Sequence, residues 1–322
     1  MRFWDLADLE RLTKEAMSRL PRDIGVVVSL SESSTYASSL VSTVLRVPQV
    51  SSVEFAAWLW HKRETASGLG YATRDVESIA GQRIILFIAD SLCETRPLDL
   101  LSEAEYLRAR GEVDFGVSSL AIFALRTYMN SVNICQQTVS SDDLFSWNWM
   151  HSPVMREACI DMDGVLCVDP PIGLSERSIE YSNFLATAAP LFLPSEEVLT
   201  IVTGRLDRYM PQTEEWLSRH GVQYRRLAMY PSDSAKNKLA AGGGAPFKAS
   251  ILVRDRGAFF VESSTYEAAI IARNAGKPVL SLEDNVVIGP NGVATVLARY
   301  RSLLHKVGPS ALRQRRVVRW RR

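Results

Sequence analysis

Two aspartates near the middle of the chain, Asp161 and Asp163, follow a short apolar run and precede Gly164. If residues 157–160 form a buried strand, Asp161 lies at its carboxyl end, where open α/β sheets bind their ligands. Gly164 would then allow a sharp turn. Carboxylate oxygens in such a place suit Mg²⁺, which also accepts phosphate as a ligand. For an isolated Asp-x-Asp-Gly element, a polar turn after a core strand is the favoured interpretation. The surrounding sequence decides between such a turn and a metal site.

Polar residues also follow three later apolar runs, and a lysine lies in the first turn of an expected helix. These features are Thr203-Gly204-Arg205 after 198–202, Glu262 after 258–261, Glu283-Asp284 after 277–282, and Lys248 within 247–252. A lysine at a helix start opposes the dipole preference for acidic residues. Parallel strands bring their carboxyl ends to one edge of a sheet, so these side chains are expected to meet. Each of these residues alone could be a helix cap or a surface charge. A polar or charged residue at every one of these successive positions is much harder to explain by chance.

This order of motifs resembles the haloacid dehalogenase superfamily of Mg²⁺-dependent phosphohydrolases over residues 156–284. The resemblance implies that Asp161 is the nucleophile and that Asp163 acts first as general acid and then as base. It implies that Thr203 binds the transferred phosphoryl oxygens and that Lys248 neutralises charge on them and on Asp161.

The resemblance also implies a Mg²⁺ site and contacts to the substrate. Its metal ligands would be Asp161, Asp163 and Glu262, and the substrate contacts Gly164, Gly204 and Arg205. Only the more distant Glu267 accompanies Glu262, whereas the family often has two nearby acids. Lys236 and Lys238 compete with Lys248 for the lysine position.

The residue types fit this chemistry. A carboxylate nucleophile divides ester hydrolysis into two displacements, and a metal ion with a lysine offsets its repulsion from a phosphate dianion. Asp163 must be protonated when the leaving oxygen departs, so its pKa is expected to be raised. The stretches from Asp163 to Thr203 and from Thr203 to Lys248 are too short for a large cap domain. The first half of the chain, or a partner subunit of a homo-oligomer, is therefore expected to close the site.

The first half contains two continuous apolar runs, at 24–30 and 83–90, which indicate strands buried on both faces of a parallel sheet. Further expected elements are helices at 36–45, 52–63 and 102–110 and a strand at 118–125. The fold class predicted for the chain is α/β with two domains, each a mostly parallel sheet flanked by helices. The second would be Rossmann-like, with little or no cap.

Residues 85–95 resemble the ribose-phosphate loop of type I phosphoribosyltransferases. The resemblance implies that Asp90, Ser91 and Thr95 contact phosphoribosyl pyrophosphate or a nucleotide. Ala89 stands where that family has a second acid, so a degenerate domain that binds a ligand or caps the site is favoured. An active transferase and a scaffold without a ligand are the alternatives.

The predicted domains are residues 1–139 and 157–300, separated by an aromatic linker at 140–156 and followed by a basic tail at 301–322. Trp147 and Trp149 suit an interdomain groove and a domain core equally well. The tail could contact RNA or another polyanion, but a solvated end is favoured.

The composition of the chain limits the class of protein that it can be. The chain has 322 residues, 47% hydrophobic and 23% charged, with a net charge of +1, which gives no pull toward nucleic acid or membrane. Its four cysteines lack metal-site spacing, so all four are predicted to be reduced core thiols. The charged, amphipathic amino terminus resembles neither a secretory signal nor a membrane span, which indicates the cytoplasm.

Together these features predict a hydrolase, a Mg²⁺-dependent phosphatase acting on a small phosphorylated metabolite such as a sugar or nucleotide phosphate. The alternatives are a phosphoribosyltransferase or bifunctional enzyme, and a non-catalytic nucleotide sensor.

Overall fold

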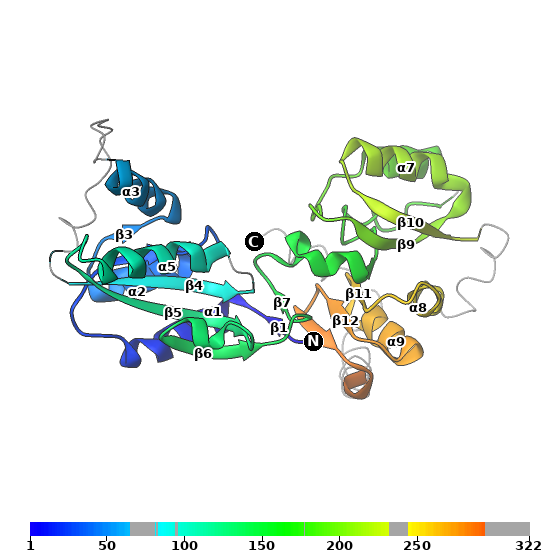
Figure 1. Cartoon of the computed structure of the whole chain (residues 1–322). Coiled ribbons are helices and arrows are strands. Elements are labelled where there is room, and N and C mark those ends of the chain that lie inside the picture. Colours follow the sequence, from blue (N-terminus) through cyan, green and yellow to red (C-terminus); the bar gives the residue numbers. More distant parts are fainter. Residues whose placement is uncertain (65–80, 82, 94–95, 177, 232–243, 294–322) are drawn as a thin grey trace. The chain divides into compact units, whose positions relative to one another are not determined.

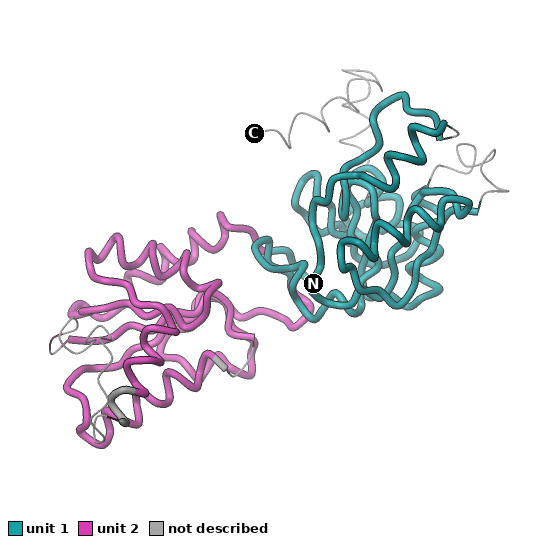
Figure 2. The backbone as a smooth tube through the Cα atoms, turned by 90° about the horizontal axis from the view of Figure 1, so that it is seen from above, with its two compact units in different colours: residues 1–3, 144–322 teal, residues 4–143 magenta. Residues whose placement is uncertain are grey.

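The computed structural model describes residues 1–64, 81, 83–93, 96–176, 178–231 and 244–293. The chain divides into two compact units, which Figure 2 shows in different colours. Unit 1 comprises Met1–Phe3 and the chain from Leu144 onward, and unit 2 comprises Trp4–Asp143.

Unit 2 is built on a five-stranded parallel sheet with the order β3-β2-β4-β5-β6. Its strands are β2 (Ile24–Ser29), β3 (Gln49–Val50), β4 (Ile84–Leu92), β5 (Gly116–Leu125) and β6 (Ile134–Val139). The flanking helices are α1 (Leu6–Ala16), α2 (Thr35–Leu45), α3 (Ser52–Glu64) and α5 (Arg96–Ala109) (Figure 1). The winding reverses between β2 and β4, so their carboxyl ends form the switch point where open α/β sheets bind ligands.

The central strands of unit 2 are buried on both faces, as their continuous apolar sequences predicted. Every residue of β2 is buried. On one face, Phe55 and Trp58 of α3 pack in the same apolar cluster as Leu107 of α5 and Phe87 of β4. Phe55 meets Phe87 edge-on, with 5.0 Å between ring centroids, a favourable aromatic geometry. This core holds the ends of β2 and β4 in place.

Unit 1 contains a six-stranded sheet with the order β10-β9-β8-β11-β12-β13. Its strands are β8 (Ala158–Ile160), β9 (Val198–Leu206), β10 (Tyr224–Tyr230), β11 (Phe259–Glu262), β12 (Val279–Ser281) and β13 (Val286–Ile288). Neighbouring strands are parallel except for β13, which runs antiparallel to β12. The winding reverses between β8 and β11, so the switch point of this sheet lies at their carboxyl ends.

Among the residues that the structure describes, the α-helices that flank the unit 1 sheet are α6 (Ile179–Thr187), α7 (Met210–Arg219), α8 (Ala245–Arg254) and α9 (Thr265–Ala275) (Figure 1). Helix α7 buries Trp216, whose indole N–H donates to the Ala188 carbonyl at 2.7 Å. A separate two-stranded sheet pairs β1 (Phe3–Trp4) with β7 (Leu144–Phe145). The prediction of an α/β chain with mostly parallel sheets flanked by helices is confirmed.

Residues 144–156, predicted as part of a linker, pack within unit 1. Trp149, Met150 and Met155 are buried in the same apolar cluster as Ile160 of β8. For Trp149 the structure therefore shows core packing, the second of the two interpretations of the aromatic segment. The predicted basic tail lies outside the described residues.

The cysteine prediction holds only in part. Cys159 and Cys167 are buried free thiols and Cys135 is half-buried, but Cys93 is exposed. The prediction of a core thiol is wrong for Cys93, because the chain leaves the sheet directly after β4. Within the described part of the chain, no helix combines the length and the apolarity needed to cross a membrane.

Candidate active site

The carboxyl ends of β8 and β11 bring two acidic side chains together at the switch point of unit 1. The strands are parallel neighbours, and the Asp161 backbone N–H donates to the Val261 carbonyl at 3.0 Å. Asp161 therefore follows β8 beside the residue with which β11 ends, Glu262. These two residues are only 5% and 1% exposed. Buried carboxylates require a positive or hydrogen-bonding partner.

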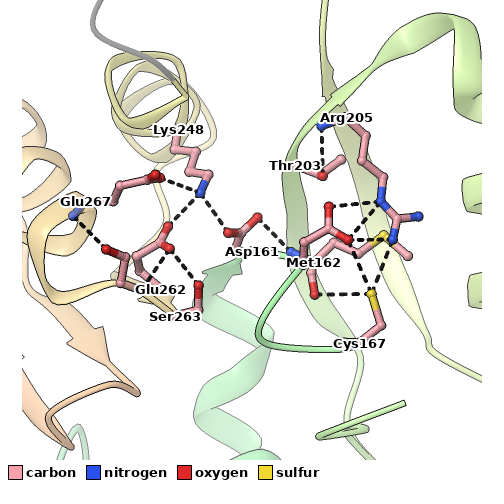
Figure 3. A network of polar contacts seen from close by, with 11 residues as sticks. Asp161, Met162, Cys167, Thr203, Arg205, Lys248, Glu262, Ser263 and Glu267 are labelled. Carbon is pink, nitrogen blue, oxygen red and sulfur yellow. Dashed lines mark hydrogen bonds and ion pairs between the residues drawn. The ribbon is translucent and has the colours of Figure 1, made fainter. Parts of the chain in front are cut away.

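Lys248, in the first turn of α8, is that partner. Its buried Nζ donates to Asp161 Oδ2 and Glu262 Oε2, both at 2.7 Å, and to Glu267 Oε2 at 3.1 Å (Figure 3). An ammonium group has three hydrogens, so all of them are used. These bonds explain why a lysine stands at a helix start. The competing Lys236 and Lys238 lie outside the described residues.

One ammonium thus serves three carboxylates of the described chain. Burial raises the pKa of Asp161 well above its usual range; Lys248 opposes this shift and Glu262 adds to it. Burial also raises the pKa of Glu262, with Lys248 opposing and Glu267 adding. Burial alone would lower the pKa of Lys248, but the three carboxylates raise it well above its ordinary value. Lys248 therefore stays charged.

Asp163 lies in the turn after β8 and is held by Arg205 of β9. Arg205 Nε donates to the two Asp163 oxygens at 3.1 and 3.0 Å, and its Nη2 donates to Oδ1 at 2.6 Å. Nη2 also lies 3.2 Å from Cys167 Sγ, and the arginine side chain is completely buried. The sequence predicted Arg205 as a contact to the substrate. In the structure its guanidinium orients Asp163, and Arg205 also lines the cavity over the site, so its contact to a substrate stays a prediction.

Gly164 turns the chain in a conformation that glycine adopts far more readily than other residues. Its φ is +76°. A Cβ at this position would lie 2.6 Å from both Cβ and Oγ of Ser263, which is too close for any side chain. The Gly164 N–H closes the turn by donating to the Cys167 carbonyl at 2.7 Å. This glycine is therefore fixed by the close approach of the loop after β11.

Thr203 lies inside β9 rather than after it. The strand continues to Leu206, Thr203 is fully buried, and its Oγ1 accepts a hydrogen bond from the Arg205 backbone N–H at 3.1 Å. A register shift in the β9–β10 pairing accompanies this stretch. The described lining of the cavity over the site includes Gly204 and Arg205 but not Thr203.

That cavity has a volume of about 180 Å³ and opens over Asp161, Asp163 and Lys248. Another wall comes from the segment after the Asp161 turn and includes Glu176 and Tyr181. The Glu176 carbonyl accepts hydrogen bonds from the Tyr209 hydroxyl and, at 3.0 Å, from Arg208 Nη2. Unit 1 therefore supplies this wall itself, and closure of the site by the first half of the chain or by a partner subunit stays a prediction.

Carboxylate oxygens are the ligand type that Mg²⁺ prefers in proteins. Asp161 and Glu262 present carboxylate oxygens that converge on Lys248, each at 2.7 Å from its Nζ. Mg²⁺ commonly uses one or two protein carboxylates and keeps waters or phosphate as further ligands. Among the described residues, no three or more His, Cys, Asp or Glu side chains already form a metal-binding group. Asp161 and Glu262 are the candidate ligands of the predicted ion, and Asp163, also predicted as a ligand, is bonded to Arg205.

In unit 2, the residue Asp90, predicted to bind a ribose phosphate, is bonded to the protein's own serine side chains. Asp90 is fully buried in β4, and its Oδ1 accepts hydrogen bonds from the hydroxyls of Ser33 and Ser34, both at 3.0 Å. Ser91 is half-buried, and Thr95 lies outside the described residues. Asp90 therefore fastens the loop after β2 to β4, at the switch point of that sheet.

Two residues of the unit 1 site did not follow from the expected motifs. Glu267 was noted only as a distant acid, but Ser264 and Glu267 have the spacing of a capping box. Ser264 Oγ accepts from the Glu267 N–H at 3.4 Å, which places Glu267 in the first turn of α9, beside Lys248. Tyr181 belongs to α6, and no motif marked it.

Comparison with known proteins gives little further information. No family model matches the chain, and no curated protein matches it in sequence. Among solved structures it is similar to a xanthine-guanine-hypoxanthine phosphoribosyltransferase of Helicobacter pylori, with 10% identity and a TM-score of 0.31, over 45% of this chain and 92% of that one. It is also similar to an orotate phosphoribosyltransferase from Aeropyrum pernix, with 11% identity and a TM-score of 0.26, over 41% of this chain and 69% of that one. TM-scores this low do not establish a shared fold.

Proposed function

We propose that unit 1 is a Mg²⁺-dependent phosphatase that hydrolyses the phosphate monoester of a small metabolite, such as a sugar or nucleotide phosphate, through an aspartyl phosphate. The observation that carries this proposal is the buried Lys248, bonded to both Asp161 and Glu262 at the switch point. Burying charged groups in this way is a poor route to stability. Acids with perturbed pKa values that line a cavity are instead typical of functional sites.

In the proposed reaction Asp161 is the nucleophile. One of its oxygens forms a bond to phosphorus while the bond from phosphorus to the leaving oxygen breaks. Asp163, oriented by Arg205, supplies the proton that the leaving oxygen takes up. A water then attacks phosphorus and gives a proton to Asp163. Inorganic phosphate departs as the bond to Asp161 breaks, and the carboxylate is restored.

Lys248 and the metal ion would both reduce the repulsion between the Asp161 carboxylate and the phosphate dianion. A carboxylate that approaches a phosphate dianion is repelled, and the Lys248 ammonium, 2.7 Å from Asp161 Oδ2, offsets part of that repulsion. Mg²⁺ held by Asp161 and Glu262 would supply further positive charge at the same place. Glu267 shares Lys248 and completes its hydrogen bonding.

The test is phosphate release by the full chain from a panel of sugar and nucleotide monophosphates, with and without Mg²⁺. We expect release that requires Mg²⁺ and falls by on the order of 1,000-fold or more in Asp161→Asn, the size of loss seen when a nucleophile is removed. Asp8→Asn, in the first turn of α1 and outside the cavity lining, is the matched control and should behave as wild type. No release from any ester, or release undiminished in Asp161→Asn, refutes the proposal.

A second candidate concerns unit 2. The Asp90 cluster lies at the switch point between β2 and β4, the part of an open α/β sheet where ligands bind. The second candidate is therefore a phosphoribosyltransferase, or a bifunctional enzyme, that would use phosphoribosyl pyrophosphate at this position. Pyrophosphate release that is lost in Asp90→Asn would support it, and its absence with every nucleobase acceptor would count against it. Binding of a nucleotide without any turnover would point to a sensor.

A further inference from the structure

Two buried side chains hold the Asp163 carboxylate. Its Oδ1 accepts from Arg205 Nη2 at 2.6 Å and from Arg205 Nε at 3.1 Å, and the Cys167 thiol lies 3.4 Å from the same oxygen. Arg205 Nη2 also donates to Cys167 Sγ at 3.2 Å, a contact that Figure 3 shows. Arg205 and Cys167 therefore contact each other as well as Asp163, and we call this pair of residues the Asp163 clamp.

The backbone fixes the thiol in this place. Cys167 is fully buried and forms isolated β-bridges with Asp163 and with Pro190. Its N–H donates to the Met162 carbonyl at 3.1 Å, and its carbonyl accepts from the Gly164 N–H at 2.7 Å. The one thiol hydrogen can go to Asp163 Oδ1 or to the Met162 carbonyl, which lies 3.7 Å from Sγ. Both acceptors belong to the turn after β8, so the thiol holds this turn in either case.

The clamp holds the two oxygens of Asp163 unequally. Oδ1 has contacts with Nη2, Nε and the thiol, whereas the hydrogen-bond donor that the described residues offer to Oδ2 is Arg205 Nε, at 3.0 Å. The Asp163 side chain is 17% exposed and lines the cavity, while Cys167 is fully buried. Oδ2 is therefore the oxygen that remains available to a reacting group in the cavity.

We propose that Cys167 is a positioning residue for proton transfer in unit 1. Together with Arg205 it fixes Oδ1 of Asp163, and Oδ2 is the oxygen that exchanges the proton. In the first displacement the proton on Oδ2 passes to the leaving oxygen as the bond from that oxygen to phosphorus breaks. In the second, the attacking water gives a proton back to Oδ2. The thiol keeps its own hydrogen throughout and acts only through Asp163. This inference rests on the proposed phosphatase activity and adds a residue to it.

A buried cysteine commonly serves as a small apolar core residue, and Cys167 does pack in an apolar cluster of unit 1. If packing were its whole role, its contacts with Asp163 would have no effect on the reaction. Cys159 provides the matched control for this alternative. It is also a fully buried free thiol of unit 1, but it packs in a different apolar cluster, together with Val202.

The experiment uses the full chain with Mg²⁺ and two kinds of ester that differ in their need for a proton. AMP and glucose 6-phosphate have alkoxide leaving groups, which require a proton, whereas the leaving group of p-nitrophenyl phosphate departs without one. On the alkyl ester that wild type cleaves faster, Cys167→Ala should lower kcat about tenfold and leave KM unchanged, a part of the 10²–10⁴-fold that a general acid contributes. Its kcat/KM on p-nitrophenyl phosphate should change by less than about twofold, because the departure of this leaving group does not use Asp163.

Three further variants separate positioning from packing. Cys159→Ala should change kcat/KM by less than about twofold on either kind of ester. Cys167→Ser restores a group that can donate and accept a hydrogen bond, and it should recover part of the loss on the alkyl ester. In an Asp163→Asn background, Cys167→Ala should cause no further loss on that ester, since residues that act as a unit have non-additive effects.

Several results would overturn the inference and leave the phosphatase proposal standing. They are an unchanged rate in Cys167→Ala, an equal loss on both kinds of ester, a further tenfold loss in the Asp163→Asn background, and wild-type cleavage of p-nitrophenyl phosphate alone. If Cys167→Ala does not fold, Cys167→Ser supports the inference by a loss confined to the alkyl ester and overturns it otherwise. If wild type releases phosphate from none of the esters, or Asp161→Asn retains full activity, the phosphatase proposal itself fails.

Discussion

Replacing Lys248 with methionine removes the ammonium that three carboxylates share and keeps a side chain of similar length. The side chains of Asp161 and Glu262 are only 7% and 1% exposed. Water therefore cannot take the place of the lost ammonium at either carboxylate. Removing one partner of a buried ion pair costs about 3–5 kcal/mol. The Glu267 side chain is 36% exposed, and its contribution is at most about 1 kcal/mol. We expect Lys248→Met to lose roughly 3–5 kcal/mol of unfolding free energy in unit 1.

This loss should depend on pH in a direction that the structure dictates. Burial raises the pKa of both Asp161 and Glu262 in the folded protein, and Lys248 is the group that opposes the shift. Without it, both folded-state pKa values rise further above their unfolded values. A folded-state pKa above the unfolded one lowers stability as pH rises from the unfolded pKa toward the folded pKa, because over that range the unfolded carboxyl ionises while the folded one stays protonated. The penalty of Lys248→Met should therefore be largest at neutral pH and shrink toward pH ~4, where even the unfolded carboxyls begin to protonate.

Calorimetric unfolding together with hydrogen exchange of the β8 and β11 amides measures this loss, because exchange assigns it to unit 1. For a domain of this size a loss of 3–5 kcal/mol corresponds to a fall in Tm of roughly 6–20 °C. Lys14→Met, whose side chain is 57% exposed on α1, is the matched control and should change stability by no more than about 0.5 kcal/mol. Two results would contradict the stabilising role of Lys248 in the buried cluster. One is a Lys248→Met protein whose free energy of unfolding at pH 7 lies within about 1 kcal/mol of the wild-type value, and the other is a loss of stability that grows on acidification.

Two further predictions concern the turn after β8 and the thiols. Gly164→Ala should lower the free energy of unfolding by about 2–5 kcal/mol, because it combines a positive φ with a Cβ placed 2.6 Å from its neighbours. Gly173→Ala, with a positive φ but open space around the Cβ, should lower it by only about 1–2 kcal/mol. Urea unfolding measures both. A thiol reagent should modify the exposed Cys93 first. Burial raises the pKa of Cys159 to about 12 and that of Cys167 still further, so mass spectrometry should find both unmodified until the protein unfolds, and rapid native labelling of either would contradict their burial.

The part of the site that could be predicted from the sequence is the part that strands determine. Continuous apolar runs mark strands buried on both faces, and the carboxyl ends of parallel strands meet at one edge. Asp161 and Glu262 each stand at such an end, so their convergence follows from the strands alone. Lys248 could be placed because a lysine is unfavourable in the first turn of a helix and so requires a partner elsewhere.

Thr203 and Arg205 show why the rest could not be predicted. Polar residues after an apolar run normally mark the end of a strand, so β9 was expected to end at Val202. The strand instead continues to Leu206, and its pairing with β10 shifts register at this point. Irregularities of this kind change the direction of a side chain, and Arg205 is buried here because Asp163, from a distant part of the sequence, neutralises it.

The Arg205–Asp163 pair also changes how the paired aspartates can be understood. The resemblance implied different roles for the two residues, and the structure gives them different partners: a lysine from α8 for Asp161 and an arginine from β9 for Asp163. Lysine presents a point charge that can serve several oxygens, whereas the arginine guanidinium fixes the plane of one carboxylate through parallel hydrogen bonds. The first arrangement leaves Asp161 in a shared electrostatic cluster, as a nucleophile that must approach a phosphate dianion requires. The second holds Asp163 in one orientation, as a group that transfers protons to and from a fixed position requires.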